Sequence, residues 1–373
     1  MRNTIRLGKV FGIEVGLDYS WFIILILITW SLAGHYLDVY QAWTPEVRWG
    51  LALLTALLFF ASVLAHEFGH SVVANAVGVP VRSITLFIFG GVAQITHEPR
   101  RALHEFLIAI AGPLVSFALA ITFALAWAAG QFLGVRSLAA VGSWLSATNL
   151  SLAVFNLIPG YPLDGGRVLR AIVWGATGNR SGATRVVGVI GQVVAWLFIL
   201  GGIVLVFNGD WADGLWIAFI GWFLNSAATS SVREVGLQES LKGHTAREVM
   251  ITDCPCVPPN LTLEQLVHDT ILATGRRYFP VIDDGRLLGL VTVHRIKEVP
   301  RDQWPLTTVT QVMIPVERLV KTQPDEELAE VMERMASEDV NQLPVIDAGG
   351  RWVGMVARNN ILSFIRRPVE LAA

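Results

Sequence analysis

Six apolar runs dominate the first 230 residues of the chain, and each is long enough to cross the hydrocarbon core of a membrane. They cover residues 20–37, 49–78, 106–129, 138–158, 186–207 and 211–229. A helix of about 20 residues spans the roughly 30 Å of hydrocarbon. The backbone polar groups of a spanning segment must be satisfied internally, which leaves helices and closed barrels. The sequence therefore predicts an α-helical polytopic membrane domain with six transmembrane helices.

The rest of the chain, from about residue 244, has the mixed composition of a soluble α/β domain. We place the membrane domain at residues 1–235 and the soluble module at residues 244–373. The mean hydropathy of the whole chain is +0.53 and its net charge is -2, without a basic stripe, so a nucleic-acid partner is not expected. Cys254 and Cys256 alone make a poor zinc site and are interpreted as reduced thiols.

Positive charges alternate between the connections of the predicted helices, which predicts their orientation. One set of connections carries most of the basic residues: Arg2, Arg6, Lys9, Arg82, Arg100, Arg101, Arg167, Arg170, Arg180, Arg185 and Arg233. Because basic loops stay inside, both termini are expected in the cytoplasm of a multi-pass cell-membrane protein. The N-terminus shows no signal-peptide pattern, so the first run is expected to remain in the mature protein. The second and fourth helices would then end near the same cytoplasmic face.

Three ionisable residues interrupt the second apolar run, in the segment His66-Glu67-Phe68-Gly69-His70. Ionisable groups inside a membrane cost about 2.5–3.5 kcal/mol each on insertion scales and usually serve a function. His66 and His70 are one helical turn apart on nearly the same face, where two imidazoles can reach one zinc ion. Glu67 is rotated by ~100° around the helix, which places it beside such a metal as a general base.

A catalytic zinc needs a third protein ligand, and two candidates compete for this role. One is a cluster between the second and third runs: His97, Glu98, His104 and Glu105. The other is Asp164, in a segment broken by Pro and Gly after the fourth run. We favour Asp164 because irregular backbone at membrane depth is tolerated where it lines a cavity, and we interpret the cluster as an interfacial charged face. Asn156 either hydrogen-bonds the substrate backbone or the oxyanion, or caps the helix end.

The motifs at residues 66–70 and 156–165, HEFGH and NLIPGYPLDG, together resemble those of the site-2 protease family of intramembrane zinc metalloproteases. The resemblance covers about residues 1–230. It implies that His66, His70 and Asp164 bind one Zn2+ per chain and that Glu67 acts as base and proton shuttle. It also implies an endopeptidase that cuts a transmembrane segment of a partner protein within the lipid bilayer, in regulated intramembrane proteolysis.

A metal transporter with a cytoplasmic sensor tail is the alternative function that the residues allow. In that interpretation His66, Glu67 and His70 form a transit site. Two histidines, a carboxylate from a second segment and a separate glutamate match hydrolysis better than transit. The sequence therefore favours the protease.

Two further segments of the membrane domain carry structural expectations. Residues 81–95, VRSITLFIFGGVAQI, alternate and contain Gly90-Gly91, which predicts a short β-hairpin or a re-entrant loop with a turn at the glycines. An exposed edge of this hairpin would hold substrate as an added strand, and a plain packing element is the alternative. Gly112-Pro113 in the third run is interpreted as close helix packing or a kink.

The soluble part contains an internal repeat, about residues 244–300 and 306–373, in which Val281 and Val345 align 64 residues apart. Its strand, turn, strand, helix pattern resembles paired cystathionine-beta-synthase-type repeats, and this tail marks a subgroup of the site-2 proteases. The resemblance implies a regulatory module that often binds adenine nucleotides. In that family a Thr or Ser after the last strand is often followed, three residues on, by an Asp that holds ribose. The first repeat has Thr292 and Arg295 at these positions, and the second has Ala357 and Asn360. Nucleotide binding, sensing through protein contacts and homodimer formation through the tail all remain open.

Overall fold

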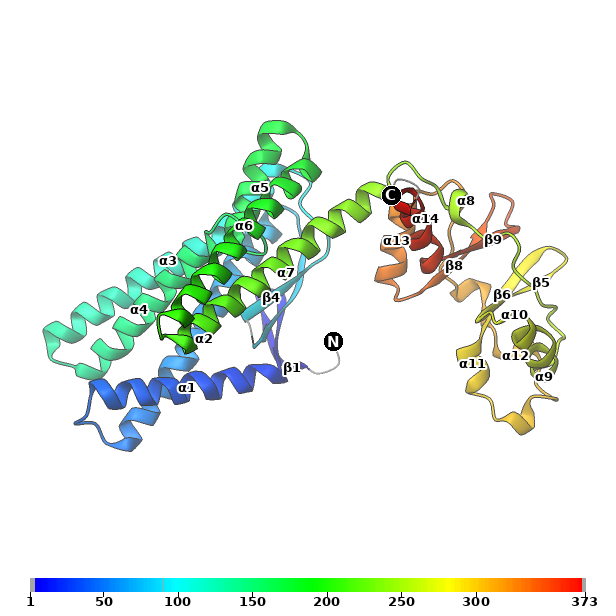
Figure 1. The fold of residues 1–373 in the computed structure, drawn as a ribbon. Helices are drawn as coiled ribbons and strands as arrows, with labels where there is room; N and C mark the ends of the chain where they lie inside the picture. Colours follow the sequence, from blue (N-terminus) through cyan, green and yellow to red (C-terminus); the bar gives the residue numbers. More distant parts are fainter. Residues whose placement is uncertain (1–3, 89, 371–373) are drawn as a thin grey trace. The chain divides into compact units, whose positions relative to one another are not determined.

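The computed structural model describes residues 4–88 and 90–370 of the chain. It divides into two compact units, Met1–Val235 and Gly236–Ala373. The first unit contains the long apolar helices and a small β-sheet, and the second is an α/β module (Figure 1).

The predicted membrane domain of six spanning helices is confirmed in the part of the chain that the structure describes. The spanning helices are α1 (Tyr19–Val39), α2 (Pro45–Ala76), α3 (Ala102–Leu133), α4 (Arg136–Asn156), α6 (Arg180–Phe207) and α7 (Trp211–Leu241). Helices α2 and α3 have 32 residues each, so each is about 48 Å long and extends beyond the hydrocarbon core.

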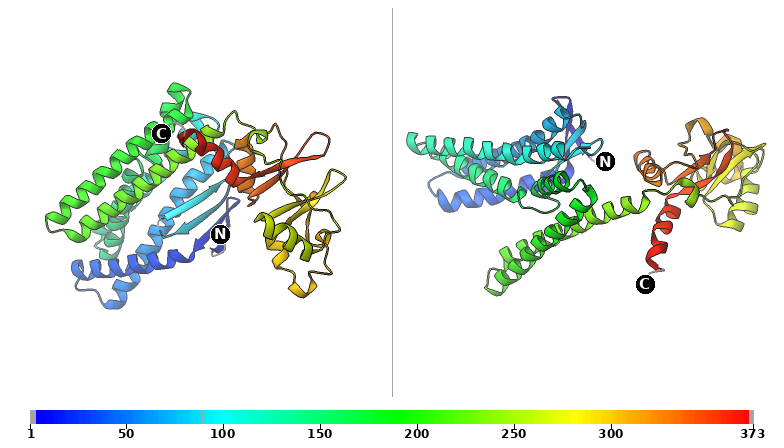
Figure 2. Two further views of the ribbon diagram at one scale, coloured as in Figure 1. Left: turned by 45° about the vertical axis from the view of Figure 1, so that its right-hand side comes forward. Right: turned by 90° about the horizontal axis from the view of Figure 1, so that it is seen from above.

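Small residues let these helices approach one another closely, as is usual where the hydrophobic effect does not drive helix association. A Cβ atom on Gly142 of α4 would lie 2.9 Å from the Phe123 carbonyl oxygen of α3, and one on Gly202 of α6 would lie 2.6 Å from the Ala218 nitrogen of α7. Helices α6 and α7 lie side by side in both views of Figure 2.

A four-stranded sheet lies beside helix α2. Its strands are β1 (Thr4–Val10), β2 (Ile13–Asp18), β3 (Val81–Phe87) and β4 (Gly90–Ile95), in that order, with β2 and β3 parallel. The predicted hairpin is therefore present as β3 and β4, and β4 lies at one edge of the sheet. Gly91 pairs with Leu86 inside the ladder, so the turn precedes the glycine pair rather than containing it. Entry of this hairpin into the bilayer stays a prediction.

Helix α5 (Asp164–Thr177) is a short helix that the apolar runs did not predict. It packs against α3 and begins directly after the broken segment that follows α4 (Figure 1). Gly165 and Gly166 make this arrangement possible, because a Cβ on Gly166 would lie 2.8 Å from the Tyr161 nitrogen and one on Gly165 would lie 2.5 Å from the Ile158 oxygen. Asp164 is thereby held at the first turn of a helix rather than in an irregular loop.

The second unit contains two similar halves built from short strands and helices. Its strands are β5 (Tyr278–Asp283), β6 (Arg286–Thr292), β7 (Ile314–Pro315), β8 (Gln342–Ile346) and β9 (Trp352–Ala357). Its α-helices are α8 (Ala246–Val249), α9 (Leu263–Gln265), α10 (Leu272–Thr274), α11 (Val293–Lys297), α12 (Val309–Val312), α13 (Leu328–Ser337) and α14 (Arg358–Glu370). Short 3-10 helices cover Arg301–Gln303 and Val316–Arg318, and the π-helix η1 covers Leu266–Ile271.

The two halves exchange their first segments. Val249, from the start of the first sequence repeat, belongs to the core that contains Leu343 and Val356 of the second repeat. Val309, from the start of the second repeat, belongs to the core around Phe279 and Val291 of the first. The sequence repeats and the packed units therefore do not coincide.

Candidate active site

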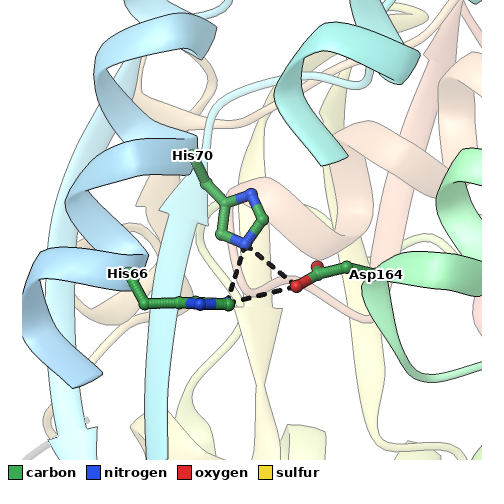
Figure 3. A group of neighbouring side chains, drawn as sticks. All are labelled: His66, His70 and Asp164. Carbon is green, nitrogen blue, oxygen red and sulfur yellow. Dashed lines mark hydrogen bonds and ion pairs between the residues drawn. The ribbon is translucent and has the colours of Figure 1, made fainter. Parts of the chain in front are cut away.

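Helices α2 and α5 bring three metal-binding side chains together. The Nε2 atoms of His66 and His70 lie 3.2 Å apart, and Asp164 Oδ2 lies 3.2 Å from the first and 3.1 Å from the second. Figure 3 shows the two imidazoles projecting from one helix toward the carboxylate at the start of another. Both histidines are buried, and the Asp164 side chain is 13% exposed.

These separations fit a zinc ion. Ligand atoms about 2.0 Å from a tetrahedral zinc stand roughly 3.3 Å from one another, close to the separations of the three atoms. Two imidazole nitrogens and a carboxylate oxygen are a donor set used by catalytic zinc, which keeps a further position for water. The sequence-predicted ligands are therefore adjacent in space, 94 and 98 residues apart along the chain.

Helix α3 sets the orientation of both imidazole rings. His70 Nδ1 donates to the Ile108 carbonyl oxygen at 2.7 Å, and His66 Nδ1 lies 2.9 Å from Ser116 Oγ. Because a carbonyl only accepts, the neutral His70 ring must carry its proton on Nδ1, which leaves the Nε2 lone pair for a metal. A hydrogen bond of this kind on the far ring nitrogen is usual for metal-binding histidines.

Gly112 of α3 leaves the space in which the ligand atoms meet. A Cβ on this residue would lie 2.7 Å from His66 Nε2 and still closer to His70 Nε2. Pro113 follows it and cannot donate to the Ala109 carbonyl, which loosens the helix at this turn. The close packing predicted at Gly112-Pro113 is therefore a contact between Gly112 and the two histidines of α2.

Glu67 lies next to the histidine pair and against the edge strand. It is partly buried, and a Cβ on Gly91 of β4 would lie 2.9 Å from its Cδ atom and 3.1 Å from Oε1. Glu67 is absent from the group of converging metal-binding atoms, which contains only the other three residues within the described part of the chain. The glutamate therefore stands beside the site, with the backbone of β4 next to it.

The other predicted site residues lie elsewhere. Asn156 is the last residue of α4 and is partly buried. In the tail, Thr292 caps α11 by accepting from the Arg295 nitrogen, and Asn360 lies in the first turn of α14 with a buried Nδ2 atom that has no partner among the described residues. None of the three is part of the converging group.

The cluster of His97, Glu98, His104 and Glu105, at and before the start of α3, does not form one charged face. Glu98 forms an ion pair with Arg180, and His97 is exposed. Glu105, in contrast, is fully buried and forms an ion pair with Arg170 of α5. For Glu105 the interpretation as an interfacial residue is wrong, because its carboxylate is covered where α3 and α5 pack.

Sequence reasoning did not find Ile108, Gly112 and Ser116 as parts of the site. Their spacing of four residues was the available signal, because residues 108, 112 and 116 lie on one face of a helix. A single hydroxyl and two aliphatic positions in an apolar run give no chemical sign of this role.

A histidine pair on one membrane helix and a carboxylate from another, with a glutamate beside them, define the class of membrane-embedded metallopeptidases. Comparison with known proteins agrees. Residues 54–135 and 128–201 match the model of peptidase family M50, and residues 246–302 and 309–367 match the CBS domain.

Relatives that match almost the whole chain are named as zinc metalloproteases. The chain is 37% identical to "Putative zinc metalloprotease sll0528" of Synechocystis sp., over 98% of this chain and 96% of the relative. It is 28% identical to "Zinc metalloprotease MJ0392" of Methanocaldococcus jannaschii, over 97% and 96%. Among solved structures, the site-2 protease from Methanocaldococcus jannaschii is 31% identical, with a TM-score of 0.42, and the match covers 62% of this chain and 95% of that one.

The chain belongs to peptidase family M50, the site-2 proteases, and carries tandem CBS domains. It is a multi-pass membrane protease that uses zinc, so the family resemblance seen in the sequence is confirmed and the transporter alternative is set aside.

Proposed function

We propose that His66, His70 and Asp164 hold the catalytic zinc and that Glu67 is the general base for cleavage of a transmembrane segment in a partner protein. The convergence of three ligand atoms within 3.2 Å of one another carries this assignment. When bound, zinc supplies Lewis acidity, which makes a water molecule more acidic and stabilises negative charge on the scissile carbonyl oxygen.

The protein's own residues then have separate tasks. His66 and His70 are fixed in orientation by α3, and Asp164 completes the ligand set from α5. Glu67 takes a proton from the attacking water and later gives it to the leaving amine nitrogen. Because Glu67 is not needed as a ligand, its carboxylate is free for both transfers.

The edge strand β4 supports a means of presenting the substrate. A helical peptide has its carbonyls in hydrogen bonds, so it must unwind before attack. Among the described strands β4 pairs with β3 alone, and its Gly91 lies against Glu67. An extended substrate segment added to the free edge would pass beside the catalytic base. We assign Asn156 a hydrogen bond to the backbone of that segment.

The orientation and location of the chain belong to the same proposal. The alternation of Arg and Lys between connections supports cytoplasmic termini in the cell membrane. The second unit, residues 244–373, would then act as a cytoplasmic module that regulates cleavage, through a ligand or through pairing with a second copy.

The tail ligand has its own test. Titration of the full chain with AMP or ATP, for the wild type and Thr292→Val, measures whether the first repeat binds an adenine nucleotide. Arg295 stands where the nucleotide-binding pattern has an Asp, so no carboxylate is offered to a ribose there, and its guanidinium donates to Glu298 at 2.9 Å. Saturable binding that Thr292→Val weakens would establish the nucleotide site. An absence of binding would favour pairing or protein contacts.

Zinc content and cleavage together test the ligand set. The full chain is purified in detergent as wild type, Glu67→Gln and Asp164→Ala, with Glu98→Gln as a control acidic variant away from the site. Zinc per chain is measured, and cleavage is followed on a set of epitope-tagged single-span proteins. Glu67→Gln should keep about one zinc per chain and lose cleavage, while Asp164→Ala should lose zinc. Full zinc occupancy in Asp164→Ala would remove the third ligand from the proposal.

A further inference from the structure

One face of helix α3 contacts both histidines of the candidate site and helix α5. Glu105, Ile108, Gly112 and Ser116 follow one another at spacings of three and four residues, which places them on a single helix face. Ile108 and Ser116 contact the two imidazoles, and Gly112 leaves room for the ligand atoms. Glu105 instead forms an ion pair with Arg170 of α5.

The contact between Glu105 and α5 is a buried ion pair. Both Nε and Nη2 of Arg170 approach the same carboxylate oxygen, Glu105 Oε1. Glu105 is 0% exposed and Arg170 is 7% exposed. The second oxygen, Oε2, has no hydrogen-bond partner among the described residues, so the side-chain hydrogen bonding of this carboxylate rests on Arg170.

Arg170 also holds the segment that leads into Asp164. Its guanidinium carbon lies 5.6 Å from the centre of the Tyr161 ring, within the range of a cation–π contact. Tyr161 precedes Asp164 by three residues, and Arg170 follows it by six. One side chain thus connects the broken segment, the helix that begins at Asp164 and helix α3.

We propose that Arg170 and Glu105 are positioning residues, which fix Asp164 relative to the two histidines and thereby set how tightly the site retains zinc. The inference rests on the proposed role of Asp164 as a ligand. His66 and His70 share helix α2, so their separation is set by that helix. Asp164 comes from a different helix, and its distance from the histidines depends on how α5 packs on α3.

The ion pair can be altered by substitutions that test its positioning role. Breaking a buried pair leaves one charge unpaired, whereas replacing both partners by neutral groups of similar shape is often tolerated by the fold. Glu105→Gln keeps the shape of the acid, and Arg170→Gln places a shorter neutral amide on α5, so the double variant leaves neither charge unpaired and removes the charge attraction. Arg170→Lys keeps the charge and loses the two-nitrogen contact.

The chain provides a matched control. Arg180 and Glu98 form another Arg–Glu ion pair, but its side chains are 34% and 65% exposed, and neither belongs to the converging ligand group. Glu98→Gln combined with Arg180→Gln removes the same chemical groups outside the site.

The experiment measures zinc release from the purified full chain. Zinc-loaded wild type, the two double variants and Arg170→Lys are mixed with an excess of a chromogenic chelator, and the release rate is recorded. Thermal unfolding of each zinc-free protein is measured separately. We expect the Glu105→Gln/Arg170→Gln variant to release zinc about tenfold faster than wild type, at the lower end of the effect of outer partners on metal affinity. Arg170→Lys should fall between the two, and the control variant should match wild type.

The outcomes separate a positioning role from a purely structural one. Lowered unfolding temperature of the zinc-free double variant, with wild-type zinc release from the folded protein, would overturn the inference. Faster zinc release in the control variant as well would also overturn it, because the loss of an ion pair outside the site would then have the same effect. A wild-type chain that retains no zinc would overturn the proposed ligand set itself. This outcome differs from the other two because it is seen in the wild type, before any variant is compared.

Discussion

Gly112→Ala is expected to remove zinc binding while leaving the fold intact. The added Cβ would stand 2.7 Å from His66 Nε2 and closer to His70 Nε2, whereas ordinary contacts of a Cβ begin at 3.4 Å. The His66 nitrogen alone would have to retreat by about 0.7 Å, more than the ~0.5 Å within which a functional constellation must be held. We expect zinc affinity to fall at least ~100-fold, because both imidazoles are displaced from the meeting point of the ligands.

The fold should tolerate Gly112→Ala, because the added methyl group displaces the two imidazole side chains and not the backbone of α3. Alanine is favoured over glycine inside a helix by about 1 kcal/mol, and in the zinc-free protein the imidazoles can turn aside. Zinc content and the unfolding temperature of the zinc-free protein are measured for Gly112→Ala. Gly34→Ala in α1 is the control, because a Cβ there would have no atom of the described residues within 4 Å. Wild-type zinc content in Gly112→Ala would refute the geometry of the site.

Three further substitutions and one chemical modification test other parts of the structure. Ser116→Ala removes the partner of an imidazole and should weaken zinc binding about tenfold in a chelator competition. Gly91→Ala places a Cβ 2.9 Å from the Cδ atom of Glu67, so kcat should fall while zinc content stays at the wild-type level. Burial raises the pKa of the Cys254 thiol to about 11. Since only the thiolate reacts, iodoacetamide at pH 8 should leave this cysteine unmodified in the folded chain, as read by mass spectrometry. Val249→Ala should lower hydrogen-exchange protection in the second sequence repeat more than in the first.

The ligands of the candidate site could be predicted from the sequence because their chemistry conflicts with their surroundings. His66 and His70 stand inside an apolar run, and their spacing by one turn is a local property of a helix. Asp164 required a longer argument, since no local pattern joins it to a histidine 94 residues away. The broken backbone around it was the useful signal, although that segment turned out to begin helix α5.

The supporting residues could not be predicted because their roles depend on which helix packs against which. Ile108 acts through a backbone carbonyl, which every residue has, and Gly112 acts through an absent side chain. Glu105 is polar, and its position close to the end of a predicted span suggested solvent or headgroup contact. Only the packing of α5 over α3 reveals that its carboxylate is buried against Arg170.

The tail shows the same limit at the scale of a domain. Its internal repeat was visible because PVID occurs twice, and the strands that contain the PVI of each copy, β5 and β8, are present as expected. The repeat predicted two successive units, yet each half takes the first segment of the other into its core. Periodicity records which segments are alike, whereas packing decides which of two alike segments fills a given core. Because each half takes part of its core from the other, a change in the first segment of one repeat affects the packing of the other.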